Sequence, residues 1–219
     1  MNERLAALLQ GAGVWRARTA VNGARRAAVT AAQVVATGWP RLDAELAAGG
    51  WPLGTLVELL LPEPGAGELR LLLPALRTLA GGPGAGQEQR WLALIGAPHA
   101  PYPPALAQGG IRPERLLLIA ASTRQDRLWA MEQALRSDGC TAVLAWFDAV
   151  DDRWLRRLKL AAERGRTLAV LLRPLHARRA ASPAVLRLVL EPTPAALDVH
   201  LLKSRGRGPR QIRDVFGCG

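Results

Sequence analysis

Residues 62–69 read Pro-Glu-Pro-Gly-Ala-Gly-Glu-Leu, and they decide how the rest of the chain is interpreted. An apolar run at 56–61 precedes them, and a run with helical spacing at 69–79 follows. An apolar strand, a glycine-containing loop and a helix in this order form the setting of a phosphate-binding loop, or P-loop. The stretch therefore predicts an α/β core built around a strand–loop–helix unit.

This loop lacks the side chains that phosphate chemistry needs. The P-loop pattern is Gly, four residues, then Gly-Lys-Ser/Thr, and here Pro62 replaces the first glycine while Gly67 keeps the second. Glu68 replaces the lysine and Leu69 replaces the magnesium-binding hydroxyl. At ~4 Å and an effective dielectric of ~20, reversing one charge changes the interaction with a phosphate by several kcal/mol. Arg70 cannot hold magnesium, so we expect no nucleotide hydrolysis; weak binding through backbone N–H groups stays an alternative.

Strand-like and helical runs alternate through the core. The strand-like runs are 55–61, 90–95, 116–120, 141–147, 167–172, 185–190 and 197–203. The helical runs are 68–80, 103–109, 124–137 and 151–164, after a short helix around 42–46. Continuously apolar strands are typical of a parallel sheet covered on both faces. Because the last strands have no helices between them, we expect an α/β fold with a mostly parallel sheet and an antiparallel edge.

Composition divides the chain into three parts. We expect a basic N-terminal arm at 1–37, a core at 38–202 and a basic C-terminal segment at 203–219. The arm carries apolar residues that suit one helical face and an aromatic anchor for a partner interface. These candidate interface residues are Leu5, Leu8, Leu9 and Trp15. Packing of the tryptophan in the core is the alternative.

The 219-residue chain carries a net charge of +11 and a sequence pI of about 11.4. Such a balance favours contact with nucleic acid or with an acidic protein surface, although a solvated basic face is the third possibility. The basic candidates lie in the late part of the chain: Arg173, Arg178, Arg179, Lys203, Arg205, Arg207, Arg210 and Arg213. Any DNA binding through them is expected to be weak and independent of base sequence.

Several other functions are disfavoured by the sequence. The two cysteines, Cys140 and Cys218, form no disulfide framework and no metal-ligand spacing, so we expect no metal and no cofactor. No apolar run reaches 18 residues, and no signal-peptide pattern opens the chain. We therefore expect a protein of the cytoplasm, associated with the nucleoid.

Several segments resemble RecA recombinases in order and spacing, among them a strand and helix at Ile111–Ile119 and Gln125–Leu135. Gly50–Glu58 resembles the turn and strand that enter the RecA phosphate loop, and Ala93–Pro103 resembles the strand end that carries the catalytic glutamate. Pro98 stands where that glutamate would be. Thr141–Asp148 and Leu197–Phe216 resemble the acidic strand and the late basic strand. The resemblance implies a RecA-like core whose nucleotide site is vestigial, at Gly65, Gly67, Glu68, Leu69 and Asp148. For Asp148, the alternative is a structural role on the surface or as a helix cap.

Within this superfamily the chain is most similar to ImuA proteins. The segments that carry this likeness are Val14–Ala17, Gly49–Pro52, Glu58–Leu60, Gly65–Leu69 and Leu71–Leu76. SulA cell-division inhibitors share the last two, but they are usually shorter, and residues 173–216 favour ImuA.

The ImuA resemblance implies a non-enzymatic accessory of SOS-induced translesion DNA synthesis. Its implied partners are RecA, the polymerase homologue ImuB and a C-family translesion polymerase, with DNA as a further, weak partner. Two alternatives stay open. One is a SulA-type inhibitor that binds FtsZ, and the other is a RecA-like DNA-dependent ATPase.

Overall fold

The computed structural model describes residues 34–81, 90–137, 139–194 and 196–217. The chain separates into two units, Met1–Ala31 and Ala32–Gly219, and every described residue belongs to the second. The predicted interface residues Leu5, Leu8, Leu9 and Trp15 lie outside the described residues. Within the described ranges, no helix is both long enough and apolar enough to cross a membrane.

Ten strands are described. They are β1 (Val34–Val35), β2 (Trp51–Pro52), β3 (Thr55–Leu61), β4 (Trp91–Ile95), β5 (Leu116–Ile119), β6 (Cys140–Trp146), β7 (Leu168–Pro174), β8 (Leu186–Pro192), β9 (Leu197–Lys203) and β10 (Arg210–Ile212).

The helices alternate with the early strands. They are α2 (Pro40–Glu45), α3 (Glu68–Leu79), α4 (Pro103–Gln108), α5 (Arg124–Arg136) and α6 (Asp152–Gly165), with the 3-10 turns η1 (Pro113–Arg115) and η2 (Leu175–Arg179).

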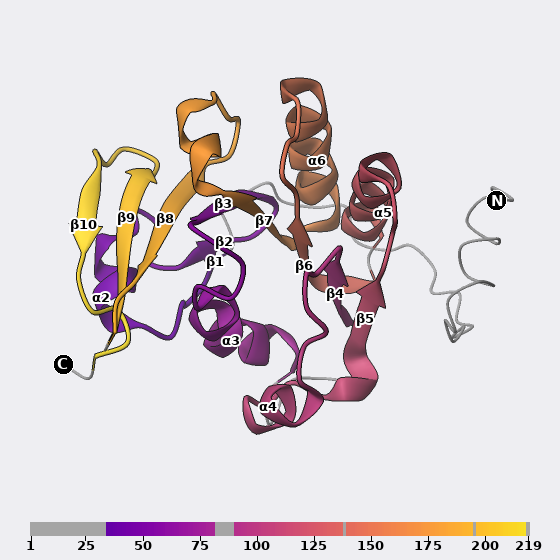
Figure 1. Ribbon diagram of the computed structural model, residues 1–219, viewed down its shortest axis with the longest axis horizontal. Helices are drawn as coiled ribbons and strands as arrows, with labels where there is room; N and C mark the ends of the chain where they lie inside the picture. Colours follow the sequence, from indigo (N-terminus) through magenta and orange to yellow (C-terminus); the bar gives the residue numbers. More distant parts are fainter. Residues whose placement is uncertain (1–33, 82–89, 138, 195, 218–219) are drawn as a thin grey trace, which may run out of the picture. The chain divides into compact units, whose positions relative to one another are not determined.

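Eight of the strands form one sheet, in the order β10-β9-β8-β3-β7-β6-β4-β5 (Figure 1). The strands from β8 to β5 in this order are parallel, whereas β9 and β10 pair antiparallel at one edge. β1 and β2 form a separate antiparallel pair. The predicted α/β class and the antiparallel edge are therefore confirmed, while a RecA-like identity for this core stays a prediction.

Both faces of the sheet are covered, as β3 demonstrates. Val57, Leu59 and Leu61 pack in the core cluster that includes α3, whereas Leu56 packs in the cluster that includes α5 and α6. Successive side chains of a strand point to opposite faces, so burial on both sides produces the continuous apolar run in the sequence. In Figure 1, α5 and α6 lie together on one side of the sheet and α3 lies on the other.

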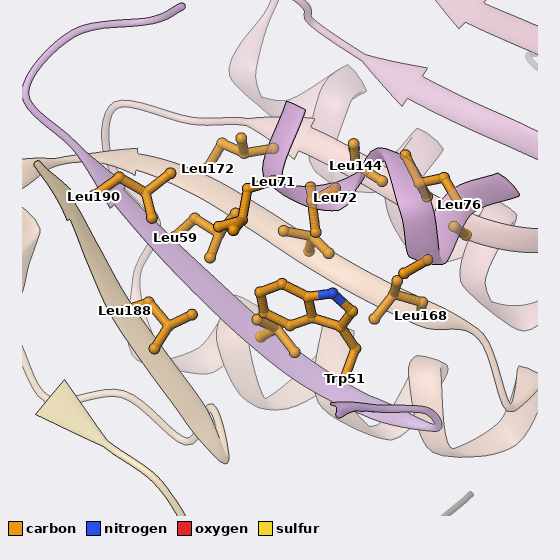
Figure 2. Close-up of a cluster of buried hydrophobic side chains, with 14 of the residues drawn as sticks. Trp51, Leu59, Leu71, Leu72, Leu76, Leu144, Leu168, Leu172, Leu188 and Leu190 are labelled. Carbon is orange, nitrogen blue, oxygen red and sulfur yellow. The ribbon is translucent and has the colours of Figure 1, made fainter. Parts of the chain in front are cut away.

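The indole of Trp51 lies fully buried at the centre of the α3-side cluster. Figure 2 shows it surrounded by leucines from β3, β7, β8 and α3. The leucines labelled there on these four elements are Leu59, Leu71, Leu72, Leu76, Leu168, Leu172, Leu188 and Leu190.

The predicted element bounds agree closely with the described ones. Each helix predicted by range from 68 onward lies within one residue of α3, α4, α5 or α6 at both ends, and the predicted strands lie within two residues of β3 to β9. The sequence did not predict the short strands β1 and β2, which pair with each other, or the edge strand β10. β10 falls in the segment expected to be a separate basic tail, and its pairing with β9 joins that segment to the sheet.

Candidate functional site

The loop between β3 and α3 is closed by the first residue of its own helix. The N–H of Gly65 donates to Oε1 of Glu68 at 2.9 Å, and the Glu68 side chain is only 4% exposed. Gly65 and Gly67 have φ values of 89° and 97°, a left-handed conformation that glycine adopts without strain. In an active P-loop such backbone N–H groups hold phosphate oxygens. Here a carboxylate occupies one of these donors.

A carboxylate also suits the start of α3 electrostatically. The partial positive charge at a helix N-terminus stabilises an anion by roughly 0.3–1 kcal/mol. The second carboxylate oxygen of Glu68, Oε2, is enclosed and has no hydrogen-bond partner among the described residues. The loop therefore contains an internal anion, and a phosphate that entered would meet that negative charge.

The two residues after Glu68 contact other parts of the fold and not the loop. Leu69 packs against the α3-side core, and the guanidinium of Arg70 lies 4.1 Å from the ring centroid of Phe216. Phe216 also contacts Trp39, with the two ring centroids 4.7 Å apart. Arg70, on α3, thus packs against the C-terminal segment through Phe216. The sequence contained no signal for this contact, because its partners are 146 positions apart.

A cavity of about 260 Å³ opens at the carboxyl ends of the parallel strands. Ligands of open α/β sheets bind in such a crevice. The cavity lining brings together Glu63 from the loop, Pro98 after β4 and the exposed Asp148 after β6. Asp148 and Pro98, which are far apart in the sequence, therefore line the same cavity. Gly65, Gly67, Glu68 and Leu69 do not line this cavity.

The sequence analysis missed two further lining residues, Arg127 and Trp146, and it placed a third, Arg173, among the basic candidates. Arg127, Trp146 and Arg173 line the same cavity, and each has an enclosed N–H with no acceptor among the described residues: Nε of both arginines and Nε1 of the indole. An unpaired buried donor costs about 1–3 kcal/mol. Their positions at strand ends and on α5 place them together only in the folded chain.

A second buried glutamate, Glu58 on β3, has hydrogen-bond partners on both carboxylate oxygens. Glu58 is 0% exposed, and its Oε1 accepts hydrogen bonds from Arg173 Nη1 at 3.1 Å and Ser182 Oγ at 2.8 Å. Its Oε2 accepts from Arg187 Nε at 2.7 Å. The two remaining nitrogens of Arg187 donate to the carbonyls of Ala177 and Ala180. This cluster ties β3 to β7, η2 and β8.

The predicted basic residues are distributed over different environments. Arg173 is 5% exposed and is held by Glu58, so its charge is neutralised inside the fold. Lys203 donates to the carbonyl of Ser182. Arg207 and Arg210 both contact Glu45 of α2.

Four of the predicted basic residues point to solvent. Arg178 and Arg179 are exposed in η2, and Arg205 and Arg213 are exposed on either side of β10. No hydrogen bond or ion pair joins these four side chains to other residues in the described part of the chain. They are the members of the predicted set that are free to meet an acidic partner.

Other chemistry has little support in this structure. Burial raises the pKa of the Cys140 thiol, which keeps it protonated and a poor nucleophile. Among the described residues, no group of three His, Cys, Asp or Glu side chains gathers as a metal site.

The fold and the loop together define an α/β protein whose strand–loop–helix unit lacks the groups of phosphate chemistry. No protein-family model matches the chain. The chain is similar to the cell division inhibitor SulA of Edwardsiella piscicida, with 32% identity over 112 residues, which cover 51% of this chain and 63% of that protein. It is also similar to SulA of Photorhabdus laumondii, with 30% identity over 48% of this chain and 56% of that protein. A third relative is SulA of Pseudomonas aeruginosa, with 30% identity over 48% of this chain and 63% of that protein.

These similarities support a relation to SulA proteins at a coarse level. The chain spans 56–63% of the length of these three relatives, and about half of this chain lies outside each match. The relatives are named as inhibitors and not by a catalytic activity, which agrees with the prediction that this chain is not an enzyme. The finer resemblance to ImuA stays a prediction.

Proposed function

We propose that this chain is a non-catalytic accessory of the SOS response that acts by binding partner proteins, and specifically that it links RecA to the ImuB and C-family polymerase machinery of translesion synthesis. The observation that carries the non-catalytic part is the hydrogen bond from Gly65 to Glu68, which closes the phosphate loop with a carboxylate.

Three missing groups argue against nucleotide hydrolysis. Nucleotide hydrolysis needs a cation on the phosphates, a hydroxyl on magnesium and a group that positions the attacking water. Glu68, Leu69 and Pro98 occupy the three corresponding positions. Asp148 lines the neighbouring cavity but has none of these partners. A DNA-dependent ATPase is accordingly not part of the proposal.

The support for a role in translesion synthesis comes from the late part of the chain. Residues 173–216 extend the likeness to ImuA beyond what SulA-type chains usually contain, and about half of the chain lies outside each SulA match. The same part carries the four exposed cations Arg178, Arg179, Arg205 and Arg213. Exposed cations favour encounter with an acidic protein face or with DNA phosphates.

A second candidate is a cell-division inhibitor that binds FtsZ. The specific support for it is the similarity to SulA proteins of several bacteria. It shares the non-catalytic scaffold with the first candidate and differs in the partner, so the partner decides between the two.

The deciding experiment uses the purified full chain, immobilised, with purified RecA on single-stranded DNA and purified FtsZ as separate prey. We expect capture of RecA and no inhibition of FtsZ polymerisation. Inhibition of FtsZ without RecA capture would replace the first candidate with the second. Failure to bind either protein would contradict the proposed function.

The non-catalytic part is tested by ATP turnover of wild type and of Glu68→Lys, each with and without DNA. Glu68→Lys restores the loop lysine, but Leu69 and Pro98 still withhold the hydroxyl and the carboxylate. Neither protein should therefore hydrolyse ATP above background. Turnover by the wild type that disappears in Asp148→Ala would contradict this expectation.

A further inference from the structure

A second cavity lies at the opposite end of the parallel strands from the degenerate loop. It has a volume of about 290 Å³ and is lined at the amino ends of β3 and β8, around Thr55 and Leu186. Its apolar lining includes Leu46, Pro52, Leu53 and Val185. Neither the phosphate-loop argument nor the basic-segment prediction accounts for this cavity.

The turn that shapes this cavity is the segment Gly50–Gly54. A Cβ on Gly50 would lie 2.4 Å from the carbonyl oxygen of Val35, so no larger residue fits there. Gly54 has a φ of +65°, and its N–H donates to the carbonyl of Thr167 at 3.1 Å. These constraints fix the turn against the end of α6 and give the cavity a rigid wall.

The rim of the cavity has an excess of positive charge. Lys159 and Glu163 line it and pair with each other at 3.7 Å, so their charges offset one another. Arg205 also lines it, is exposed, and has no ion-pair partner among the described residues. The cavity lining therefore carries one unpaired positive charge, that of Arg205.

We propose that this cavity binds an acidic segment of a partner protein, with one large apolar side chain in the cavity and a carboxylate against Arg205. The volume falls just below the range of about 300–1,000 Å³ typical of small-molecule sites, and it suits a single anchoring side chain. An apolar floor with a basic rim matches an apolar residue flanked by acids.

The positive charge at the rim favours an acidic partner segment over the N-terminal arm of this chain or a second copy of it. The N-terminal arm of this chain is itself basic, with Arg4, Arg16, Arg18, Arg25 and Arg26 against Glu3, and a second copy of the chain carries the same net charge of +11. Neither complements a basic rim. DNA would meet the cations, but the cavity lining contains no aromatic side chain on which a base could stack.

This inference deepens the proposed function and rests on it, because it assumes a protein partner. The test uses the full chain and three fluorescent peptides of equal length, measured by anisotropy. The peptides are Asp-Glu-Leu-Phe-Glu-Asp, Asp-Glu-Gly-Gly-Glu-Asp and Lys-Arg-Leu-Phe-Arg-Lys. We expect the first to bind about tenfold or more tightly than the second, which has no large apolar side chain, and than the third, whose cations repel the basic rim.

Two variants locate the binding in the cavity. Arg205→Glu reverses a rim charge, and Ala48→Trp fills the cavity from an exposed rim position without changing charge. Each should weaken binding of the first peptide about tenfold. Arg213→Glu is the matched control, because it makes the same charge change on an exposed residue outside the cavity lining. It should leave binding within about twofold of wild type.

Other outcomes overturn the inference. They are equal binding of the three peptides, equal losses in Arg205→Glu and Arg213→Glu, or displacement of the first peptide by a single-stranded oligonucleotide, which would assign the rim to DNA. The proposed function is judged separately by RecA and FtsZ capture. If wild type, Arg205→Glu and Ala48→Trp all capture a partner equally, the proposed function stands and the cavity inference fails.

Discussion

Glu58 and Glu68 belong to the same strand–loop–helix unit and are both buried, yet their surroundings differ completely. Glu58, on β3, is paired with two arginines and a serine. Glu68, at the start of α3, has one backbone N–H on one oxygen and no described partner on the other. The first carboxylate holds distant strands together, whereas the second closes a local loop.

This difference teaches that burial alone does not define what a charged residue does. A buried charge with matched partners becomes part of the fold, and removing it leaves those partners unpaired. A buried charge at a helix start has only local consequences for stability. At position 68 the carboxylate instead accepts the N–H of Gly65 within the loop.

The largest expected effect comes from Glu58→Ala. Two buried guanidiniums, those of Arg173 and Arg187, would lose their counter-ion. We expect the free energy of unfolding, measured with urea, to fall by about 3–5 kcal/mol. Glu132→Ala is the control, because Glu132 is also buried and paired with two arginines, but those arginines are nearly half exposed and can be hydrated. A loss no larger than that of the control would contradict the role of Glu58.

The next prediction separates the two arginines of the cluster. Arg187→Met removes the bond to Glu58 and two bonds to carbonyls, so we expect a loss of about 2–4 kcal/mol. Arg173→Met removes one hydrogen bond to Glu58 and leaves Glu58 with Arg187 and Ser182, so we expect a loss of about 1–2 kcal/mol. Urea denaturation of the two variants gives the order. The opposite order would mean that the carbonyl contacts of Arg187 contribute little.

Glu68→Gln should change stability much less than Glu58→Ala. The amide oxygen can still accept the N–H of Gly65, and only the charge at the helix start is lost. We expect the free energy of unfolding to stay within about 1 kcal/mol of wild type. A loss of several kcal/mol in the same urea titration would place Glu68 in the structural class of Glu58.

The smallest effect concerns the packing of the C-terminal segment on α3. Arg70 lies over the ring of Phe216, and such a contact contributes about 0.5–1 kcal/mol at a partly exposed site. A double-mutant cycle with Arg70→Ala and Phe216→Leu should give a coupling energy of this size. Additive effects of the two substitutions would show that the contact does not stabilise the fold.

The sequence by itself determined the element types and their order. Hydrophobic periodicity is local, so the runs at 68–80 and 124–137 predicted α3 and α5 within one residue. That the loop has no lysine and no hydroxyl at the P-loop positions was also readable, because it depends only on the identities of Glu68 and Leu69. Short strands such as β10 were missed, since three residues with two exposed side chains carry no periodic signal.

Only the tertiary structure decided which side chains meet. Glu58 is joined to residues 115 and 129 positions away, and no local pattern marks such partners. The sequence analysis placed Arg173 among the candidates for contact with nucleic acid or an acidic partner, and the structure puts it beside Glu58 at 5% exposure. A guanidinium seeks solvent or a counter-ion, and the chain order alone does not reveal which one the folded sheet brings to it.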